Sequence, residues 1–298
     1  MKGHIVVRVV IASGKGGTGK TMIATSLALI AAENSDAALL DADVEAPNAD
    51  LFIQPTFNQT QPVEQMIPRI DAALCTHCGR CAEVCQYHAI AALPAVTLVF
   101  GELCHGCGSC ALNCPSQAIS ETPRPIGLIE AGLAENLSCA RGVLEVGEAM
   151  ATPVIRALKR YAHDAGWDRK QWLILDAPPG TSCPVIETLR GADVALLVTE
   201  PTPFGLHDLR LAVQVARDTL HLPIAVVINK DCPDSADTDM EQYCQAANLP
   251  VLLRVPLSRE IATAYSTGQP LVRAFAEYRP LFQALLDDLS RLVDRNPS

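Results

Sequence analysis

Short runs of apolar residues recur along most of the chain and alternate with segments that have helical spacing. The runs cover Val6–Ala12, Ala37–Leu40, Trp172–Leu175, Val194–Val198, Ile224–Ile228 and Val251–Val255. Apolar residues are almost continuous within each run, which is typical of parallel strands that are covered on both faces. The pattern therefore predicts a buried, mostly parallel β-sheet.

Segments between these runs indicate how helices cover the predicted sheet. One helical face is made of Ile23, Leu27 and Ile30, which recur at i, i+4 and i+7. A further helix is expected from Val213 to Leu220, after a turn that contains Pro203 and Gly205. Strands that alternate with helices predict an α/β fold with a doubly wound, mostly parallel sheet.

The last helical pattern has an apolar face made of Leu281, Leu285, Leu289 and Leu292. Its polar face carries Asp287, Asp288 and Asp294 and has no lysine. Helices that lie on membranes are rich in basic residues on their polar face. We therefore expect this helix to pack on the sheet rather than on a membrane.

Residues 55–125 interrupt the alternation of strands and helices. The segment is punctuated by Pro55, Pro62, Pro68, Pro94, Pro115, Pro123 and Pro125. Because proline ends regular elements, we expect only short elements here. The pattern predicts a small inserted domain at 55–125 within a larger domain formed by residues 1–54 and 126–298.

The composition is that of a folded, acidic protein. Of 298 residues, 49% are hydrophobic and 19% are charged, which excludes a disordered chain. Lys and Arg total 23 against 33 Asp and Glu, and the net charge of −10 opposes binding to nucleic acid and to anionic membranes. No apolar stretch approaches the roughly 20 residues of a membrane span. We expect neither nucleic acid nor a membrane as a partner.

Eight of the twelve cysteines lie close together in the insert. A secreted protein with so many cysteines would begin with a signal peptide, whereas the first apolar run here contains Arg8 and leads into a glycine-rich loop. We therefore expect a reducing, cytoplasmic location. The eight cysteines form two copies of C-x2-C-x2-C-x3-C, namely Cys75, Cys78, Cys81 and Cys85, then Cys104, Cys107, Cys110 and Cys114.

This spacing is typical of [4Fe-4S] clusters, in which three close cysteines bind one cluster and the fourth binds the other. Cluster 1 would use Cys75, Cys78, Cys81 and Cys114. Cluster 2 would use Cys85, Cys104, Cys107 and Cys110. Two tetrahedral zinc sites are the alternative, although zinc ligands usually come in widely separated pairs. Over the whole insert, the pattern resembles the bacterial two-cluster ferredoxins.

A glycine-rich loop follows the first apolar run and opens the first helix. It fits G-x-x-x-x-G-K-[ST], in which glycines let backbone N–H groups surround phosphates. Lys20 would bind the outer phosphates, and the Thr21 hydroxyl would ligate Mg²⁺. The expected ATP-binding residues of this loop are Gly14, Lys15, Gly16, Gly17, Thr18, Gly19, Lys20 and Thr21.

The additional lysine, Lys15, completes the motif K-G-G-x-G-K-[ST]. This motif resembles the loop of the MinD, ParA, Mrp and nitrogenase iron protein superfamily. In that superfamily two protomers enclose the nucleotide, and this lysine reaches into the partner's site. The resemblance implies a homodimer that forms with ATP, with Lys15, Lys20 and Asp43 as catalytic residues.

Further segments resemble the same superfamily in the same order along the chain. In the segment that resembles the first switch, Asp43 would orient the attacking water and Asp41 would lie near Mg²⁺. In the segment that resembles the second switch, Asp176 would hold Mg²⁺ and the Gly180 amide would contact the γ-phosphate. The positions at which these ATPases hold adenine correspond to Asn229 and Pro256.

Four cysteines lie outside the repeat. The resemblance to nitrogenase iron protein implies, as a hypothesis, that Cys139 and Cys183 of two protomers hold a bridging third cluster. Buried cysteines without a ligand role are the alternative. Cys232 and Cys244 lack ligand spacing, and we assign them no role.

The resemblance implies an ATPase with ATP, Mg²⁺ and two [4Fe-4S] clusters as cofactors. Its hydrolysis would be coupled to electron transfer or to the assembly of iron–sulfur or other metal cofactors, with a redox or assembly protein as partner. Two alternatives stay open. One is a nucleotide-switched iron–sulfur carrier or scaffold with little turnover, and the other is a positioning ATPase of the MinD or ParA kind.

Overall fold

The computed structural model describes residues 6–232 and 238–295. Within these residues, the main sheet has nine strands in the order β11-β10-β9-β1-β8-β2-β7-β6-β3. They are β1 (Val7–Ala12), β2 (Ala37–Asp41), β3 (Thr56–Ile70), β6 (Ile119–Ala134), β7 (Leu137–Leu144), β8 (Trp172–Asp176), β9 (Val194–Thr199), β10 (Ile224–Asp231) and β11 (Val251–Pro256). Neighbours from β11 to β7 are parallel, and β6 and β3 form an antiparallel edge. The predicted mostly parallel α/β sheet is confirmed.

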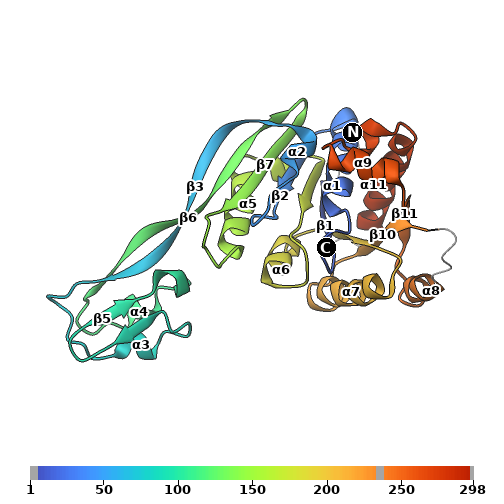
Figure 1. Ribbon diagram of the computed structural model, residues 1–298. Coiled ribbons are helices and arrows are strands. Elements are labelled where there is room, and N and C mark those ends of the chain that lie inside the picture. The colour runs from blue at the N-terminus through green and yellow to red at the C-terminus, as the bar shows by residue number, and fades with distance from the viewer. Residues whose placement is uncertain (1–5, 233–237, 296–298) are drawn as a thin grey trace.

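Helices cover both faces of this sheet (Figure 1). One face packs against α1 (Lys20–Asn34), α10 (Leu271–Ala274) and α11 (Tyr278–Arg295). The other packs against α5 (Thr152–Asp164), α6 (Cys183–Leu189), α7 (Pro203–Val213) and α8 (Thr238–Ala246). Two further helices are α2 (Asp50–Ile53) and α9 (Arg259–Ser266). Among the helices that the structure describes, none is long and apolar enough to cross a membrane.

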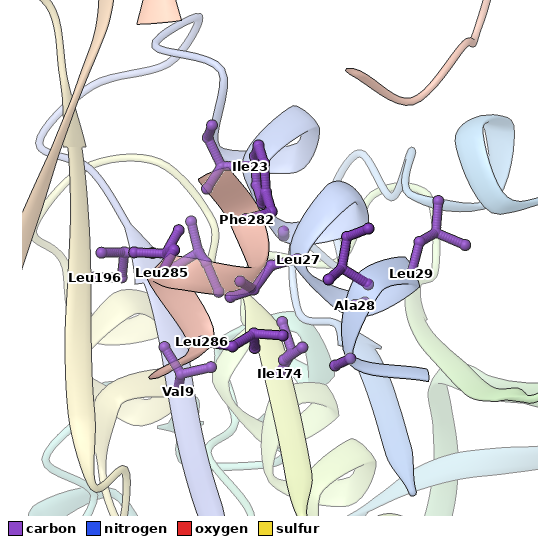
Figure 2. Close-up of a cluster of buried hydrophobic side chains, with 14 of the residues drawn as sticks. Val9, Ile23, Leu27, Ala28, Leu29, Ile174, Leu196, Phe282, Leu285 and Leu286 are labelled. Atoms are coloured by element: carbon purple, nitrogen blue, oxygen red, sulfur yellow. The ribbon is translucent and has the colours of Figure 1, made fainter. Parts of the chain in front are cut away.

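The last helix, α11, packs on the sheet as predicted. Figure 2 shows Phe282, Leu285 and Leu286 against side chains of α1 and of the central strands. Phe282 is completely buried, as is Leu289, whereas Leu281 remains 45% exposed. The apolar face of the helix therefore lies slightly to one side of the predicted stripe.

The predicted turn at Pro203 and Gly205 is wrong, because both residues belong to α7. Thr202 caps this helix by accepting a hydrogen bond from the Gly205 N–H at 2.9 Å. Proline is favourable at the first position of a helix, where its missing N–H is not needed. The predicted helix from Val213 to Leu220 is the end of α7 and a π-helical segment, Gln214–Thr219.

The two longest strands, β3 and β6, form an antiparallel ribbon that pairs from Thr56↔Leu133 to Ile70↔Ile119. One half of the ribbon joins the main sheet through β7, and the other half extends away from it (Figure 1). The expectation of only short elements in 55–125 is therefore wrong. The expected boundary between residues 125 and 126 falls inside β6.

A small cysteine module, residues 71–118, lies at the far end of the ribbon (Figure 1). It contains two short helices, α3 (Arg80–Glu83) and α4 (Ser109–Leu112), and a hairpin of β4 (Ile90–Ala92) and β5 (Thr97–Val99). Its own apolar cluster, centred on Cys81, Ile90 and Cys110, is separate from the two clusters of the main sheet. The module therefore buries few apolar side chains of its own, and two of the three residues at the centre of its cluster are cysteines.

Candidate functional site

The glycine-rich loop turns between β1 and α1 with two glycines in left-handed conformations. Gly17 has φ 77° and Gly19 has φ 93°, which side chains with a Cβ rarely adopt. The Asn229 amide donates a hydrogen bond to the Thr18 carbonyl at 2.7 Å. A Cβ on Gly19 would collide with this amide. Position 19 therefore requires glycine, because the loop contacts the end of β10 there.

Lys20, the first residue of α1, is buried beneath the loop and only 7% exposed. Its Nζ donates a hydrogen bond to the Ser13 hydroxyl at 3.0 Å. Burial lowers the pKa of Lys20 from its ordinary value, although Asp176 and Asp43 oppose this shift. A buried ammonium that is held by one hydroxyl is well placed to bind an anion such as a phosphate.

Thr21 and Asp176 form the part of the site that fits a magnesium ion. The Thr21 hydroxyl donates a hydrogen bond to Asp176 Oδ2 at 2.6 Å. Asp176 Oδ1 is buried and has no hydrogen-bond partner among the described residues. Burial raises the pKa of Asp176 well above its ordinary value, and the charge of Asp41 adds to this. An orphaned carboxylate oxygen beside a hydroxyl matches the oxygen ligands that Mg²⁺ prefers.

Asp41 lies opposite Asp176 on the neighbouring strand but has a different environment. Its carboxylate accepts hydrogen bonds from the N–H groups of Asp43 at 3.1 Å, Asn48 at 2.9 Å and Ala49 at 2.9 Å. Burial raises the pKa of Asp41 to about 6, and these three hydrogen bonds oppose the shift. In this structure Asp41 therefore organises the loop of residues 43–49.

Asp43, the expected water-orienting residue, is part of this loop. Burial raises its pKa from the ordinary value, while the nearby charge of Lys20 lowers it. The structure thus brings Asp43, Lys20 and Asp176 into electrostatic contact with one another. Sequence reasoning identified all three residues from separate motifs.

Lys15 is bound within its own chain. Its Nζ lies 3.1 Å from Glu200 Oε2, and Lys230 Nζ lies 2.5 Å from Glu200 Oε1. Lys230 also donates a hydrogen bond to the Gly17 carbonyl at 2.9 Å. Burial raises the pKa of Glu200, but the two lysines outweigh it and lower the pKa overall. Sequence reasoning missed Glu200, which directly follows β9 and has no motif of its own.

Gly180, expected to contact the γ-phosphate, makes a different contact here. Its N–H donates a hydrogen bond to the Ser13 carbonyl at 3.0 Å. The segment that resembles the second switch is therefore attached to the start of the phosphate loop. A phosphate that recruits this amide would have to break the bond to Ser13.

A cavity of ≈ 220 Å³ adjoins the loop at the place expected for adenine. It is lined by Asn229 and Pro256, as expected, and by residues of α9 and the segment before it. Sequence reasoning did not identify the remaining apolar lining, which includes Met22, Leu257, Ile261 and Tyr265. An apolar cavity with a few polar groups at its edge is typical of a site for a planar base.

The cysteine module contains a much smaller cavity of ≈ 20 Å³, lined by Cys85 from the first half of the repeat and by Cys104, Cys107 and Cys110 from the second. Backbone N–H groups point at two of these sulfurs. Ala89 N lies 3.3 Å from Cys85 Sγ, and Gly106 N lies 3.4 Å from Cys104 Sγ. Thiolates around an iron–sulfur cluster accept hydrogen bonds of this kind. The donor set therefore fits the expected ligands of cluster 2.

The first half of the repeat has the same local structure as the second. Each short helix begins after a left-handed glycine, Gly79 with φ 80° and Gly108 with φ 71°. Cys114 Sγ accepts a hydrogen bond from Ala118 N at 3.3 Å, which repeats the contact of Cys85 with Ala89. In the part of the chain that the structure describes, no three Cys, His, Asp or Glu side chains converge on a point that could hold one metal ion.

Cys139 and Cys183, the hypothetical ligands of a bridging cluster, are not brought together. Cys139 is 2% exposed in β7, within the apolar cluster that includes α1. Burial raises its pKa to about 12. Cys183 is exposed at the start of α6, which covers the other face of the sheet. Because Cys139 is inside the core, the structure favours the alternative of a buried cysteine there.

A phosphate loop with a buried lysine, a carboxylate at the end of the neighbouring strand and a base-sized cavity define an α/β protein that binds nucleotides. Within this class, the chain belongs to the family of the CobQ/CobB/MinD/ParA nucleotide binding domain, which matches residues 9–271. Proteins of the MinD and ParA type in this family are nucleotide-hydrolysing P-loop ATPases.

The chain is similar to proteins of several kinds. The uncharacterized protein MJ0578 of Methanocaldococcus jannaschii is 37% identical over 209 residues, which are 70% of this chain and 72% of that protein. Human cytosolic Fe-S cluster assembly factor NUBP2 is 28% identical over 156 residues, 47% of this chain and 57% of that protein. The structure of septum site-determining protein MinD from Pyrococcus horikoshii, complexed with Mg-ADP, has a TM-score of 0.56, is 18% identical and covers 97% of both chains. This last similarity shows the fold.

Proposed function

We propose that the chain hydrolyses MgATP as a homodimer and couples this to a ferredoxin-like module with two [4Fe-4S] clusters. The observation that carries the proposal is the cavity lined by four cysteines from both halves of the repeat. A single zinc ion would draw its thiolates to one point, whereas a cluster spreads its ligands over four corners. Such a cluster supplies one-electron transfer when bound.

Each residue around the phosphate loop has a proposed role in hydrolysis. Lys20 would stabilise charge on the outer phosphates, and Thr21 with Asp176 would hold Mg²⁺. Asp43 would orient the attacking water, while Asp41 keeps its loop in place. Lys15 would leave Glu200 and enter the partner's site when the dimer forms.

Contacts between the nucleotide site and the cysteine module support the coupling. Val44, beside Asp43, accepts a hydrogen bond from Leu144 N at 2.8 Å. In the loop that follows Leu144, Glu148 binds Arg124 of β6 through both carboxylate oxygens, one of them at 2.8 Å. The Arg124 guanidinium also donates a hydrogen bond to the Gly101 carbonyl in the module at 3.3 Å. A movement of residues 43–49 thus has a direct path to the module.

The similarity to a cytosolic Fe-S cluster assembly factor suggests the class of partner. We propose that the partner is a cytoplasmic protein that receives electrons or an iron–sulfur or other metal cofactor. The net charge of −10 supports a protein partner over nucleic acid or anionic membrane.

The experiment that tests this function is anaerobic purification, followed by iron and sulfide analysis and by electron paramagnetic resonance of the dithionite-reduced protein with and without MgATP. We expect about eight irons per chain and a spectrum that changes with MgATP. The C85S variant should lose iron, whereas C244S, which removes a buried thiol of α8, should not. The K20A variant should keep its iron and lose the response to MgATP. A chain that binds no iron, or a spectrum that MgATP leaves unchanged, would refute the proposal.

A further inference from the structure

A cavity of ≈ 250 Å³ lies on the face of the sheet that α5 and α6 cover. The floor of this cavity is apolar and is formed by Val10, Leu40, Leu173 and Leu175. These residues belong to the core on one side of the sheet, whereas the residues of α1 belong to the core on the other side. The cavity therefore lies on the opposite face of the sheet from α1, the helix that follows the phosphate loop.

Three cationic side chains, from Arg8, Lys159 and Arg190, line the rim of the cavity. Arg8 and Arg190 are close enough to Lys159 to influence its pKa. Burial lowers the pKa of Lys159, Glu187 opposes this, and the charges of Arg190 and Arg8 lower it further. Convergence of like charges on one cavity costs free energy unless an anion compensates it.

The acidic groups nearby are already paired with other residues. Asp168, which also lines the cavity, accepts a hydrogen bond from His163 Nδ1 at 2.8 Å. Glu187 is shared between Arg156 at 3.1 Å and Arg190 at 3.5 Å. The Asp193 carboxylate accepts a hydrogen bond from the Arg8 backbone N–H at 2.7 Å, whereas within residues 6–232 and 238–295 the Arg8 guanidinium has no hydrogen bond or ion pair.

The hydrogen-bond donors around the cavity indicate the chemistry of the ligand. Lys159 Nζ already donates to the carbonyls of Glu187 at 2.8 Å, Thr188 at 3.4 Å and Arg190 at 2.5 Å, which accounts for its three N–H groups. The donors left for a ligand are thus the Arg8 guanidinium and those N–H groups of Arg190 that do not face Glu187. The planar geometry of a guanidinium matches a carboxylate. The apolar floor has room for a tail, because cavities of about 150 Å³ already hold benzene.

We propose that this cavity binds a small amphiphilic anion, namely a monocarboxylate with a short aliphatic or aromatic tail. Its carboxylate binds Arg8 and Arg190, and its tail lies on Val10, Leu173 and Leu175. The residues that line the cavity belong neither to the phosphate loop nor to the cysteine module.

Isothermal titration calorimetry of the full chain with hexanoate tests this assignment. Hexanoate should bind, whereas acetate, which lacks the tail, and hexanol, which lacks the charge, should bind at least about tenfold more weakly. The R8Q variant should weaken hexanoate binding by about tenfold or more. R190Q, which changes a side chain that is 59% exposed, should weaken it without affecting folding.

The matched control is R160Q, because Arg160 is exposed on α5 and does not line the cavity. This variant loses the same charge and should bind hexanoate like the unmodified chain. The assignment is overturned if hexanoate does not bind, if acetate binds equally well, or if R190Q and R160Q have the same effect. Circular dichroism of R8Q separates loss of the site from loss of folding.

Discussion

At the residue scale, Asp41 and Asp176 face each other on neighbouring strands but differ in their hydrogen bonds. Asp41 accepts three backbone N–H groups, whereas Asp176 accepts only the Thr21 hydroxyl and keeps one oxygen without a partner. A buried carboxylate oxygen without a partner costs free energy. The nucleotide-free protein therefore carries a destabilising charge that a bound cation would compensate.

Stability should depend on pH because of this pair. The pKa of Asp41 is about 6 in the folded protein, against an ordinary value of 3.8. The folded state thus holds the proton more tightly, and raising the pH through this range destabilises it. Without nucleotide, the free energy of unfolding should fall by about 3 kcal/mol between about pH 4 and pH 6 as Asp41 ionises, and should fall further at higher pH because the pKa of Asp176 is also raised.

The D176N variant should lose the part of this pH dependence that comes from Asp176, because an amide does not titrate in this range. It should also lose Mg²⁺-dependent nucleotide binding. Urea unfolding followed by the fluorescence of Trp167 and Trp172 measures the first effect. D164N, which changes an exposed acid at the end of α5, is the control and should unfold like the unmodified chain. An equally steep pH dependence in D176N would show that the pair is not its source.

Glu200 pairs with both Lys15 and Lys230, so replacing it should change how readily the protein dimerises. Its bonds to Lys15 and Lys230 restrain the loop in a single protomer. If Lys15 must leave Glu200 to enter the partner's site, the E200Q variant should dimerise with ATP at a lower protein concentration. Partly exposed ion pairs contribute up to about 1 kcal/mol, so the expected shift is about fivefold.

Sedimentation velocity with MgATP over a range of protein concentrations measures this shift. The matched control is E241Q, which removes a remote ion pair with Arg254. Weaker dimerisation of E200Q would mean that Glu200 acts in the dimer rather than against it.

At the element scale, the β3–β6 ribbon connects the cysteine module to the sheet, and few side chains fix the angle between them. Arg124 is one of them, because it binds both Glu148 and the Gly101 carbonyl. Gln65 is another and donates a hydrogen bond to the Cys104 carbonyl. Both contacts involve residues 101–104, at the start of the second half of the repeat, so this half is held against the ribbon.

The R124Q variant should loosen the module without unfolding the sheet. Hydrogen bonds to charged groups contribute about 1.5–3 kcal/mol, so hydrogen exchange in residues 101–107 should become about tenfold faster or more. Exchange in α1 should not change. R69Q, which alters an exposed arginine on the same ribbon, is the control and should leave both regions unchanged. Unchanged exchange in residues 101–107 of R124Q would contradict a role for Arg124 in docking the module.

At the scale of the whole molecule, local patterns predict the nucleotide-binding part far better than the ribbon. Val194–Val198 is apolar on both faces, so its burial and strand character are visible in one short window. Strand β3 instead combines exposed polar residues with Pro62 and Pro68, and its partner β6 lies about fifty residues further on. The same limit applies to the site. The loop motif identifies Lys15, but its bond to Glu200 depends on the approach of β9, which no local pattern encodes.

The architecture predicts that the cysteine module can be removed and leave a folded nucleotide-binding protein. The last strand pair of the ribbon is Ile70↔Ile119, and Asp71 N donates to the Ala118 carbonyl at 2.8 Å just beyond it. Residues 72–117 can therefore be replaced by an Asn-Gly turn, which suits a two-residue hairpin.

The shortened chain should bind MgATP and dimerise with it as the full chain does, because the two apolar clusters of the main sheet contain no residue of the module. It should contain no iron, since the eight cysteines of the repeat are gone. Calorimetric titration with ADP and iron analysis measure the two properties. A shortened chain that folds but no longer binds ADP would show that the module helps to form the nucleotide site, against the separation of their cores. A shortened chain that retained iron would place iron binding outside the cysteine repeat.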